Sequence, residues 1–442
     1  MAQEKDTING IAVRGFKSIC DEQHIEIAPL TILAGANSSG KSSLMQPLLL
    51  LKQTLEAPGD PGALLLDGPN VRFTSAEQLR CKGLGAAGDA GFSIRLEKSG
   101  GPSLEVHFEV LAGQGLDVTR MLYVSSGERL EMVPGMSEEA VVAALPKNIV
   151  KMVDNLKKSE KSPTHWRVSR NRCFLAFELA VEDRPQQPLG FWPSGGMSPS
   201  MAFVNTIQST IHLPGLRGNA RRTYPKTAVG RHFPGTFDAY TASLISKWQA
   251  EKSENIADLG RDLQELGLTW KVAAKAVDDT QVELLVGRLS HSRRGGAHDM
   301  VSIADVGIGV SQSLPVLVAL LAARPGQLVY LEQPEIHLHP KAQRKLAHLL
   351  CRAAKRGIIL VIETHSALLL REVQTLVATG EMPKDDVRLH WVQRNERGAT
   401  IVTTATPDEN GAYGKWPQDF DTTELESEQG YLDAVEMKGA AE

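Results

Sequence analysis

The segment at residues 35–42, Gly-Ala-Asn-Ser-Ser-Gly-Lys-Ser, constrains the fold of this chain most, because it satisfies the pattern G-x-x-x-x-G-K-[ST] in full. An aliphatic run at residues 30–33 precedes it and predicts a strand. Apolar residues at three-to-four spacing predict a helix over residues 42–55. This strand–loop–helix order indicates an α/β fold with a phosphate-binding loop at the start of a helix.

The residue types in this loop suit a nucleoside triphosphate and its magnesium ion. Glycines let the backbone approach phosphate oxygens without a Cβ in the way. Lys41 would reach the β- and γ-phosphates, and the Ser42 hydroxyl would bind Mg²⁺. The expected nucleotide-binding residues in this segment are Gly35, Asn37, Ser38, Ser39, Gly40, Lys41, Ser42 and Ser43.

A second apolar strand, predicted at residues 328–331, ends in the acidic residue Glu332. A carboxylate at a strand end beside the phosphate loop is what a nucleotide-bound Mg²⁺ needs, directly or through water. The expected metal ligands are therefore Ser42 and Glu332.

A third strand, predicted at residues 358–362, is followed by Glu-Thr-His-Ser at 363–366. His365 at this strand end can hydrogen-bond a γ-phosphate or an attacking water. His337 and His339 are interpreted as parts of a structural or inter-subunit loop, because two histidines at i, i+2 make a poor metal site alone.

These motifs together resemble those of ABC-type ATPase heads. The sequence Arg-Gly-Phe-Lys-Ser-Ile at residues 14–19 is similar to the opening of heads in the SMC, RecF and RecN group. Glu-Gln-Pro-Glu-Ile-His-Leu-His-Pro at 332–340 and Glu-Thr-His-Ser at 363–366 resemble the OLD-like branch. That branch contains bacterial AAA-family ATPases, many encoded in anti-phage defence systems. The resemblance covers roughly residues 8–55 and 300–405.

The resemblance implies ATP as the nucleotide and gives individual residues roles. Lys41 and Ser42 become the Walker A pair, Glu332 the Walker B acid and His365 the switch histidine.

The resemblance also implies a dimer. Residues 305–312 lie where the ABC signature loop should be, just before a helix and the Walker B strand. By analogy, Gly309 and Ser311 would contact the γ-phosphate of ATP bound to a second copy of the chain. ATP would then join two incomplete sites in a head-to-head pair.

One residue departs from the ABC pattern. The position after the Walker B acid usually holds a glutamate, the presumed general base, but here it holds Gln333. An amide cannot take a proton from water at neutral pH, although it can orient water. Either Glu335 supplies the base, or hydrolysis is slow and ATP acts chiefly as a clamp. The expected catalytic residues are Glu332, Gln333, Glu335 and His365, and the coupling glutamine stays open among Gln46, Gln53 and Gln78.

The expected fold is an α/β P-loop NTPase of the ABC-head type, split in sequence, with an antiparallel β appendage and a compact helical and strand insertion. No heptad run is sustained, so a long coiled coil is not expected. The predicted parts are residues 1–145 with Walker A and the appendage, 146–299 as the insertion, 300–405 as the second half of the head, and a C-terminal extension at 406–442.

A basic stretch in the insertion leaves DNA binding open. Arginines on glycine-rich loops grip phosphate backbones, but they also form solvated faces or protein interfaces. The net charge of −4 gives no support for strong DNA binding. The residues concerned are Arg217, Arg221, Arg222, Arg293 and Arg294.

No nuclease constellation is expected in the chain itself. An Asp-x-Asp pair occurs at Asp419 and Asp421, but it lies in a polar tail without an apolar strand before it. OLD nucleases carry a Toprim domain after the head, and the residues that remain here are too few for one. Effector chemistry is therefore expected in a separate partner, a nuclease or a toxin.

The four cysteines lie far apart without a CxxC pair, which argues against a zinc ribbon and a disulfide framework. The N-terminus lacks the apolar stretch of a secretory signal, and the longest apolar runs are too short to span a bilayer. The expected location is the reducing cytoplasm, without membrane association.

Three functional hypotheses follow. The first is an ATP-dependent sensor or scaffold that dimerises on ATP and controls a separate effector in phage defence. The second is a RecF- or SMC-like repair or recombination ATPase that binds DNA directly. The third is a nucleotide-gated interaction module with little hydrolysis.

Overall fold

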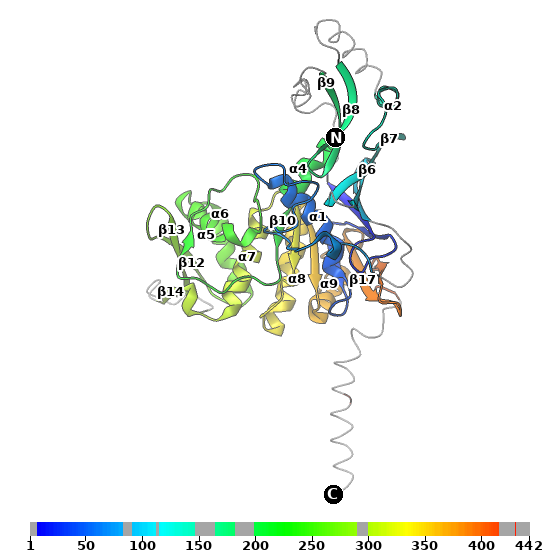
Figure 1. Ribbon diagram of the computed structural model, residues 1–442. Coiled ribbons are helices and arrows are strands. Elements are labelled where there is room, and N and C mark those ends of the chain that lie inside the picture. The colour runs from blue at the N-terminus through cyan, green and yellow to red at the C-terminus, as the bar shows by residue number, and fades with distance from the viewer. Residues whose placement is uncertain are drawn as a thin grey trace.

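The computed structural model describes residues 7–82, 91–111, 115–145, 164–181, 199–289, 299–414 and 429. Two six-stranded sheets form its centre, and a smaller unit of helices and strands lies beside them (Figure 1). Strands from both ends of the described chain meet in one sheet, as a head split in sequence requires.

The sheet that carries the phosphate loop, here called the head sheet, has the order β10-β15-β16-β3-β17-β18. Its neighbouring strands are parallel except for β18, which runs antiparallel to β17. The predicted apolar runs are buried strands, as expected where helices cover both faces of a parallel sheet. The strands are β10 (Ile211–Leu213), β15 (Leu328–Glu332), β16 (Ile359–Thr364), β3 (Leu30–Ala34), β17 (Val387–Arg394) and β18 (Thr400–Ala405).

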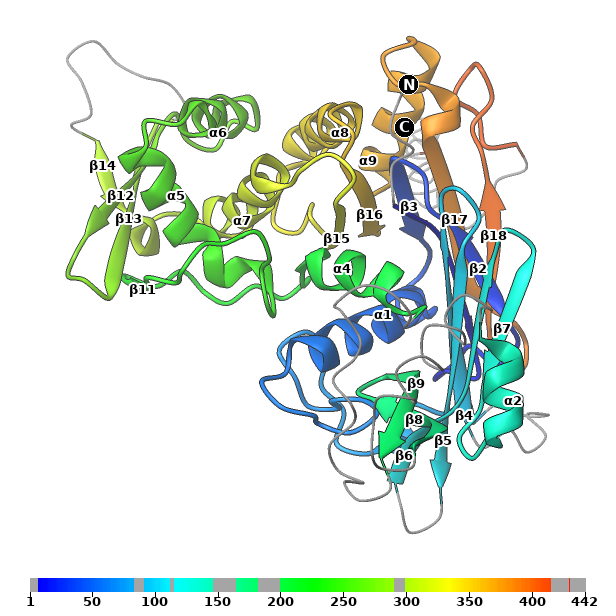
Figure 2. The same ribbon diagram turned by 90° about the horizontal axis from the view of Figure 1, so that it is seen from above.

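Helices pack on both faces of the head sheet (Figure 2). Successive side chains of a strand point to opposite faces. Ile32 of β3 accordingly packs in the core that includes α7, α8 and α9, whereas Leu33 packs with α1 and the second sheet. The helices are α1 (Lys41–Glu56), α4 (Met201–Ser209), α7 (Ile308–Ala322), α8 (Pro340–Lys355) and α9 (Ala367–Ala378), and a 3-10 turn, η4 (Lys384–Asp386), precedes β17.

The predicted antiparallel appendage is confirmed as a second sheet with the order β2-β1-β4-β5-β6-β7. Its strands are β1 (Ile8–Arg14), β2 (Gln23–Glu26), β4 (Gly91–Lys98), β5 (Ser103–Leu111), β6 (Gly115–Ser125) and β7 (Glu128–Met132). The remaining elements of this side are η1 (Ala76–Gln78), α2 (Glu138–Ala144) and the hairpin of β8 (Thr164–Asn171) and β9 (Phe174–Val181). Residues 146–163, between α2 and β8, lie outside the described residues.

The compact insertion lies at the other end of the head sheet from this appendage (Figure 1, Figure 2). It consists of η2 (Phe237–Tyr240), α5 (Thr241–Ala250), α6 (Glu254–Glu265), β11 (Tyr224–Pro225), β12 (Val272–Ala276), β13 (Gln281–Gly287), β14 (Met300–Ser302) and η3 (Ile303–Asp305). One strand from the region assigned to the insertion, β10, instead pairs with β15 at the edge of the head sheet. Three residues are too short for a sequence pattern to show this pairing.

Cys20 and Cys81 form a disulfide, with 5.3 Å between their Cα atoms. This bond departs from the expectation drawn from the wide cysteine spacing. The turn after β1 lies alongside residues 79–81, since Lys17 N donates to Leu79 O (2.8 Å) and Cys81 N to Gly15 O (2.7 Å). Tertiary contact therefore brings together two thiols that are 61 positions apart.

No helix in the described part of the chain is both long and apolar enough to cross a membrane.

Candidate nucleotide site

The phosphate loop joins β3 to α1 and depends on glycine at two positions. Gly35 and Gly40 have φ angles of 146° and 110°, which side-chain-bearing residues rarely adopt. A Cβ at Gly35 would collide with the carbonyl of Val392, and one at Gly40 with the hydroxyl of Thr400. The loop therefore fits closely against the β17–β18 hairpin.

Lys41, the first residue of α1, points back into the loop that precedes it. Its Nζ donates to the carbonyls of Gly35 (3.0 Å) and Ala36 (2.7 Å). The residue as a whole is buried, and burial lowers the pKa of its ammonium although Glu363 and Glu335 oppose the shift. The lysine is thus held where an anion in the loop would meet it.

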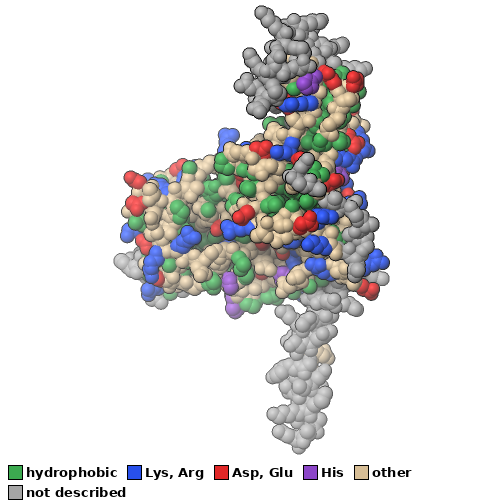
Figure 3. Space-filling view, in the orientation of Figure 1, with side chains coloured by type: hydrophobic (Ala, Val, Ile, Leu, Met, Phe, Trp, Pro, Cys, Tyr) green, Lys and Arg blue, Asp and Glu red, His purple; other side chains and the backbone are tan. Residues whose placement is uncertain are grey.

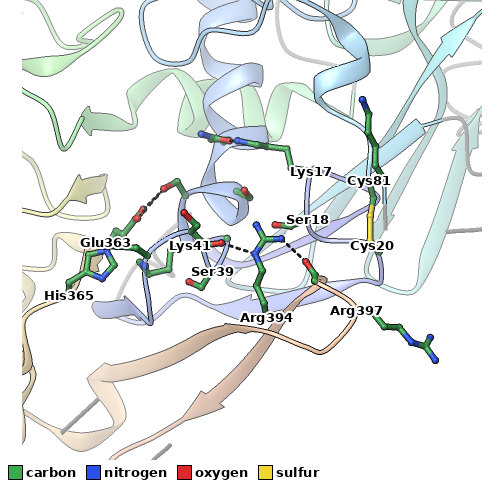
Figure 4. A pocket seen from close by; sticks show the side chains of 18 of the residues that line it. Lys17, Ser18, Cys20, Ser39, Lys41, Cys81, Glu363, His365, Arg394 and Arg397 are labelled. Carbon is green, nitrogen blue, oxygen red and sulfur yellow. Dashed lines mark hydrogen bonds between the residues drawn. A yellow bond between two sulfur atoms is a disulfide. The ribbon is translucent and has the colours of Figure 1, made fainter. Parts of the chain in front are cut away.

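A polar pocket of about 780 Å³ opens in front of the loop (Figure 4). Its rim is strongly cationic, which suits a polyphosphate. The basic residues are Lys17, Lys41, Lys82, Arg394 and Arg397, and the predicted loop residues that line the pocket are Asn37, Ser38, Ser39, Gly40, Lys41, Ser42 and Ser43. Gly35 lies at the start of the loop and contributes the carbonyl bound by Lys41.

The β17–β18 hairpin braces the loop from the far end of the chain, a contact that the sequence did not reveal. Arg394 Nε donates to Ser38 O (2.7 Å), and Thr400 Oγ1 donates to Ser39 O (2.8 Å). The hydroxyls of Ser18 and Thr400 lie 2.8 Å apart. No motif marks Arg394 or Thr400, because their importance arises from the pairing of β17 with β3.

Glu332 ends β15 as predicted, but it does not line the pocket. Its Oε1 lies 3.1 Å from His212 Nε2, and its Oε2 accepts the Gly215 N–H (3.1 Å). Burial raises the carboxyl pKa, yet the contacts with His212 and Gly215 leave it below its ordinary value. His212 itself contacts Asn70 Nδ2 through Nδ1 (3.0 Å). The predicted Walker B acid is therefore engaged by the protein on both oxygens.

Glu363, at the neighbouring strand end of β16, lines the pocket instead. Its two carboxylate oxygens accept the hydroxyl of Ser42 at 3.0 and 2.9 Å, and Oε2 also accepts the hydroxyl of Tyr330 (2.9 Å). Burial, and then Glu332, raise the pKa of this carboxyl. Sequence reasoning passed over this residue, although an acid at the end of an apolar strand was the signal that identified Glu332.

Gln333 lines the pocket and has an unusual backbone conformation, with φ at 44°. Its N–H donates to Glu363 O at 2.7 Å, which ties the residue to β16. Gln333, which follows the predicted Walker B acid Glu332, therefore lies at the pocket wall.

Glu335 lies behind His365 rather than in the phosphate pocket. Its Oε1 accepts the Thr364 hydroxyl (2.7 Å) and the His365 N–H (3.0 Å). Burial raises the Glu335 pKa, whereas burial and the nearby Lys41 lower the pKa of His365. Both residues line an adjoining hollow of about 690 Å³, and His365 also lines the phosphate pocket. Glu335 therefore fixes the Thr364 side chain and the His365 backbone through these two hydrogen bonds.

Gly309 and Ser311 lie in the first turn of α7 and do not line the pocket of their own chain. The Ser311 hydroxyl donates to Ile308 O at 3.0 Å. A Cβ at Gly309 would lie 3.4 Å from the carbonyl of His337, so the signature-like loop runs beside the segment that follows Glu332. Within one chain the structure does not bring these two residues to the phosphate loop.

The prediction that Arg217 belongs to a DNA-binding surface is wrong, because its side chain is buried and braces the site. Its guanidinium donates to the carbonyls of Gln312 (2.7 Å), Glu332 (2.9 Å) and Gln333 (3.1 Å). Burial lowers its pKa to about 10, still high enough for a positive charge at neutral pH.

The other arginines of the proposed basic surface differ from one another. Arg222 pairs with Asp305 (2.9 Å), and Arg221 is exposed. Arg293 and Arg294 lie outside the described residues. On the face shown in Figure 3, basic and acidic side chains are interspersed.

The three glutamines left open by the sequence occupy different environments. Gln46 lines the pocket and accepts Lys17 Nζ (3.0 Å). Gln53 is buried and bonds the backbone of Val71, and Gln78 bonds Thr74 in an exposed turn. Of the three, Gln46 is the one placed to meet a nucleotide.

Comparison with known proteins gives one family match. Residues 235–371 match the family model described as "AAA domain, putative AbiEii toxin, Type IV TA system". No match to the curated proteins was found.

Solved structures of SMC heads are also similar to the chain. An Smc head bound to the C-winged helix domain of ScpA shares 11% identity over 90% of this chain and 98% of that chain, with a TM-score of 0.41. The SMC head domain from Thermotoga maritima shares 10% identity over 90% and 98%, with a TM-score of 0.36. The Smc head domain with an extended coiled coil, bound to the C-terminal domain of ScpA derived from Pyrococcus furiosus, is 11% identical. The match covers 97% of this chain and 99% of that chain, with a TM-score of 0.40.

At these TM-scores the three similarities do not define the fold by themselves. The phosphate-binding motif is complete, and β16 lies between the loop strand β3 and the acid strand β15 in a parallel sheet. The complete motif and this strand order give the described residues the parallel α/β arrangement of a P-loop NTPase, and residues 235–371 are similar to the AAA-domain family.

Proposed function

We propose that this ATPase head binds ATP with Mg²⁺, hydrolyses it slowly, and uses ATP chiefly as a clamp between two copies of the chain. One observation carries the proposal: the phosphate-binding motif is complete and lines a cationic pocket, whereas the residue after Glu332 is an amide that lines the same pocket. Gln333 can orient water but cannot accept its proton at neutral pH.

The oxygen donors beside the loop fit Mg²⁺, which prefers hydroxyl, carboxylate and phosphate oxygens. They are the Ser42 hydroxyl and the carboxylates of Glu363 and Glu332. Within the described residues no cluster of three or more His, Cys, Asp or Glu would hold a metal alone, which agrees with an ion bound largely through nucleotide phosphates. When bound, Mg²⁺ neutralises charge on the β- and γ-phosphates.

The chain's own groups would do the rest. Lys41 can exchange its two loop carbonyls for phosphate oxygens without a large movement. His365, whose pKa is lowered, is neutral at pH 7 and can donate a hydrogen bond to the γ-phosphate side of the pocket. Glu335 fixes the backbone of that histidine. These groups support binding and orientation more than proton abstraction.

A pair of heads would complete the site. Gly309 and Ser311 sit at the solvent-facing start of α7, and their neighbour Ile308 is 47% exposed. In the proposed dimer this turn faces the γ-phosphate held by the second copy. The pair then acts as a sensor or scaffold that controls a separate nuclease or toxin in anti-phage defence. Direct DNA binding is less favoured, because Arg217 is buried and Arg222 is paired.

Replacement of Lys41 tests this proposal. Lys41→Ala should weaken ATP binding at least about 100-fold, because charge-assisted hydrogen bonds contribute about 1.5–3 kcal/mol each. Lys82→Ala, which removes an exposed lysine of the same pocket, should have a much smaller effect.

Two readouts are needed: calorimetric ATP affinity, and molar mass by light scattering with and without ATP. The wild type should form dimers with Mg²⁺ and ATP, and Lys41→Ala should stay monomeric. Equal ATP affinity in the wild type and Lys41→Ala would refute nucleotide binding at this loop. A wild type that binds ATP but stays monomeric would refute the clamp.

A further inference from the structure

The position of the two acids beside Ser42 separates their roles. Glu363 lines the phosphate pocket, and Glu332 does not. Both carboxylate oxygens of Glu363 meet the hydroxyl of Ser42, at 3.0 and 2.9 Å. The hydroxyl that a P-loop offers to Mg²⁺ is therefore already paired with Glu363.

The spacing between these oxygens is that of two ligands on one ion. Mg²⁺ holds oxygen ligands octahedrally at 2.0–2.1 Å, so neighbouring ligands lie about 2.9 Å apart. The Ser42 Oγ to Glu363 Oε2 distance of 2.9 Å already has this spacing, so the two oxygens could face one ion once the Ser42 hydroxyl turns its proton away from the carboxylate. Tyr330 holds Oε2 from the other side through its hydroxyl, at 2.9 Å, and so fixes the orientation of the carboxylate.

The two carboxylate oxygens of Glu332 contact other groups of the protein. Gly215 N–H donates to one oxygen, and His212 contacts the other. The Asn70 amide donates to the Gly235 carbonyl (3.1 Å) as well as meeting His212 Nδ1, so Nδ1 is the acceptor and Nε2–H faces Glu332. His212 also stacks on Tyr330, with 5.4 Å between ring centroids. Glu332 is therefore held beside Glu363 on the strand farther from the phosphate loop, because β16 lies between β15 and β3.

We propose that Glu363, together with Ser42, is the direct protein ligand of the Mg²⁺ carried by ATP, and that Glu332, whose oxygens are held by His212 and Gly215, is not. This inference rests on the proposed function of ATP binding. It moves the metal-binding acid from the Walker B strand β15 to the adjacent strand β16.

The test compares the ATP affinity of the full chain in Mg²⁺ with its affinity in EDTA. The wild type should bind ATP more tightly with the metal. In Glu363→Gln this metal-dependent gain in ATP affinity should be at least about tenfold smaller, which is the size of effect expected when a metal-site group is removed. The ATP affinity of this variant in EDTA should equal that of the wild type. Glu372→Gln is the matched control, because this buried acid of α9 pairs with Arg344 and His348 outside the phosphate pocket, and it should retain the gain.

A second variant and a second readout guard against a folding defect. Glu363→Asp keeps the charge and shortens the side chain by one methylene, so it should also lose most of the gain while remaining folded. The electron paramagnetic resonance spectrum of Mn²⁺ bound with ATP should change in both Glu363 variants and stay unchanged in the control.

The outcomes separate the two proposals. If the wild type gains affinity from Mg²⁺ and both Glu363 variants keep that gain, Glu363 is not a metal ligand, even where turnover falls. If the wild type binds no ATP in either buffer, the proposed function itself fails, and this inference fails with it.

Discussion

The two sides of the nucleotide pocket are built in different ways. The phosphate side is one continuous segment, in which backbone groups and Lys41 form the cradle. The acid side is assembled from three strands, β10, β15 and β16, whose side chains contact one another across the chain. A cradle made of backbone can be recognised from its glycines and spacing. An acid cluster cannot, since which acid faces the pocket depends on how the strand ends are packed.

This difference also affects how the two sides tolerate change. The phosphate loop is held through its carbonyls by Arg394 and Thr400. The acid side contains buried charged groups, which stay stable only while each keeps its partners. We therefore expect larger losses from substitutions on the acid side.

The largest effect is expected for Arg217, which braces the acid side. Arg217→Ala would remove the charged donor from the carbonyls of Gln312, Glu332 and Gln333, and hydrogen bonds to a charged group contribute about 1.5–3 kcal/mol each. The free energy of unfolding should fall by about 4 kcal/mol in urea titrations followed by tryptophan fluorescence. The exposed Arg221, replaced by Ala, should change it by less than about 0.5 kcal/mol.

Equal destabilisation by the two substitutions would contradict the bracing role of Arg217. A folded Arg217→Ala variant that loses only DNA affinity would restore the basic surface predicted from the sequence.

The next largest effect is expected on the ATP turnover number, from a substitution of Gln333 just after the end of β15. Gln333→Glu keeps the shape of the side chain and supplies the base missing beside Glu332. General bases contribute about 10²–10⁴-fold, so the ATP turnover number should rise by about 100-fold. Steady-state phosphate release measures this change, and Gln343→Glu, in the adjoining hollow, is the control. Rapid turnover in the wild type, unchanged by Gln333→Glu, would show that another group already acts as the base.

The smallest effect is expected on the pH dependence of stability, through His390 in the β17–β18 hairpin that contacts the phosphate loop. Burial lowers the pKa of His390 in β17 from 6.5 to about 4, and the ring contacts Glu26 O (2.8 Å) and Thr404 Oγ1 (2.9 Å). Because the folded pKa is the lower one, the unfolded chain binds more protons between pH 4 and 6.5. Stability is therefore lost as the pH falls below 6.5, by about 2 kcal/mol between pH 7 and 5.

Urea titrations at both pH values measure this loss for the wild type and for His390→Gln, which cannot titrate. The variant should show about 2 kcal/mol less pH dependence over this range. The same pH dependence in both proteins would mean that His390 is not held neutral by burial.

Much of the fold was predictable because its signals are local. The phosphate loop, the apolar strands on either side of it and the antiparallel appendage follow from short patterns of glycine and apolar residues. The place of β10 in the head sheet did not follow, since a three-residue strand carries too few residues to show a period. The Cys20–Cys81 bond did not follow either, because sequence separation says nothing about contact.

The sequence by itself determined that this chain holds a phosphate-binding loop in a parallel α/β head. The fixed positions of the G-x-x-x-x-G-K-[ST] pattern each require a specific residue type. Tertiary structure alone decided which acid meets Ser42, that Arg217 is a buried brace, and that the hairpin at residues 387–405 supports the loop. The physical reason is that carboxylates and guanidinium groups take their roles from their burial and partners, and the packing of distant strands sets both.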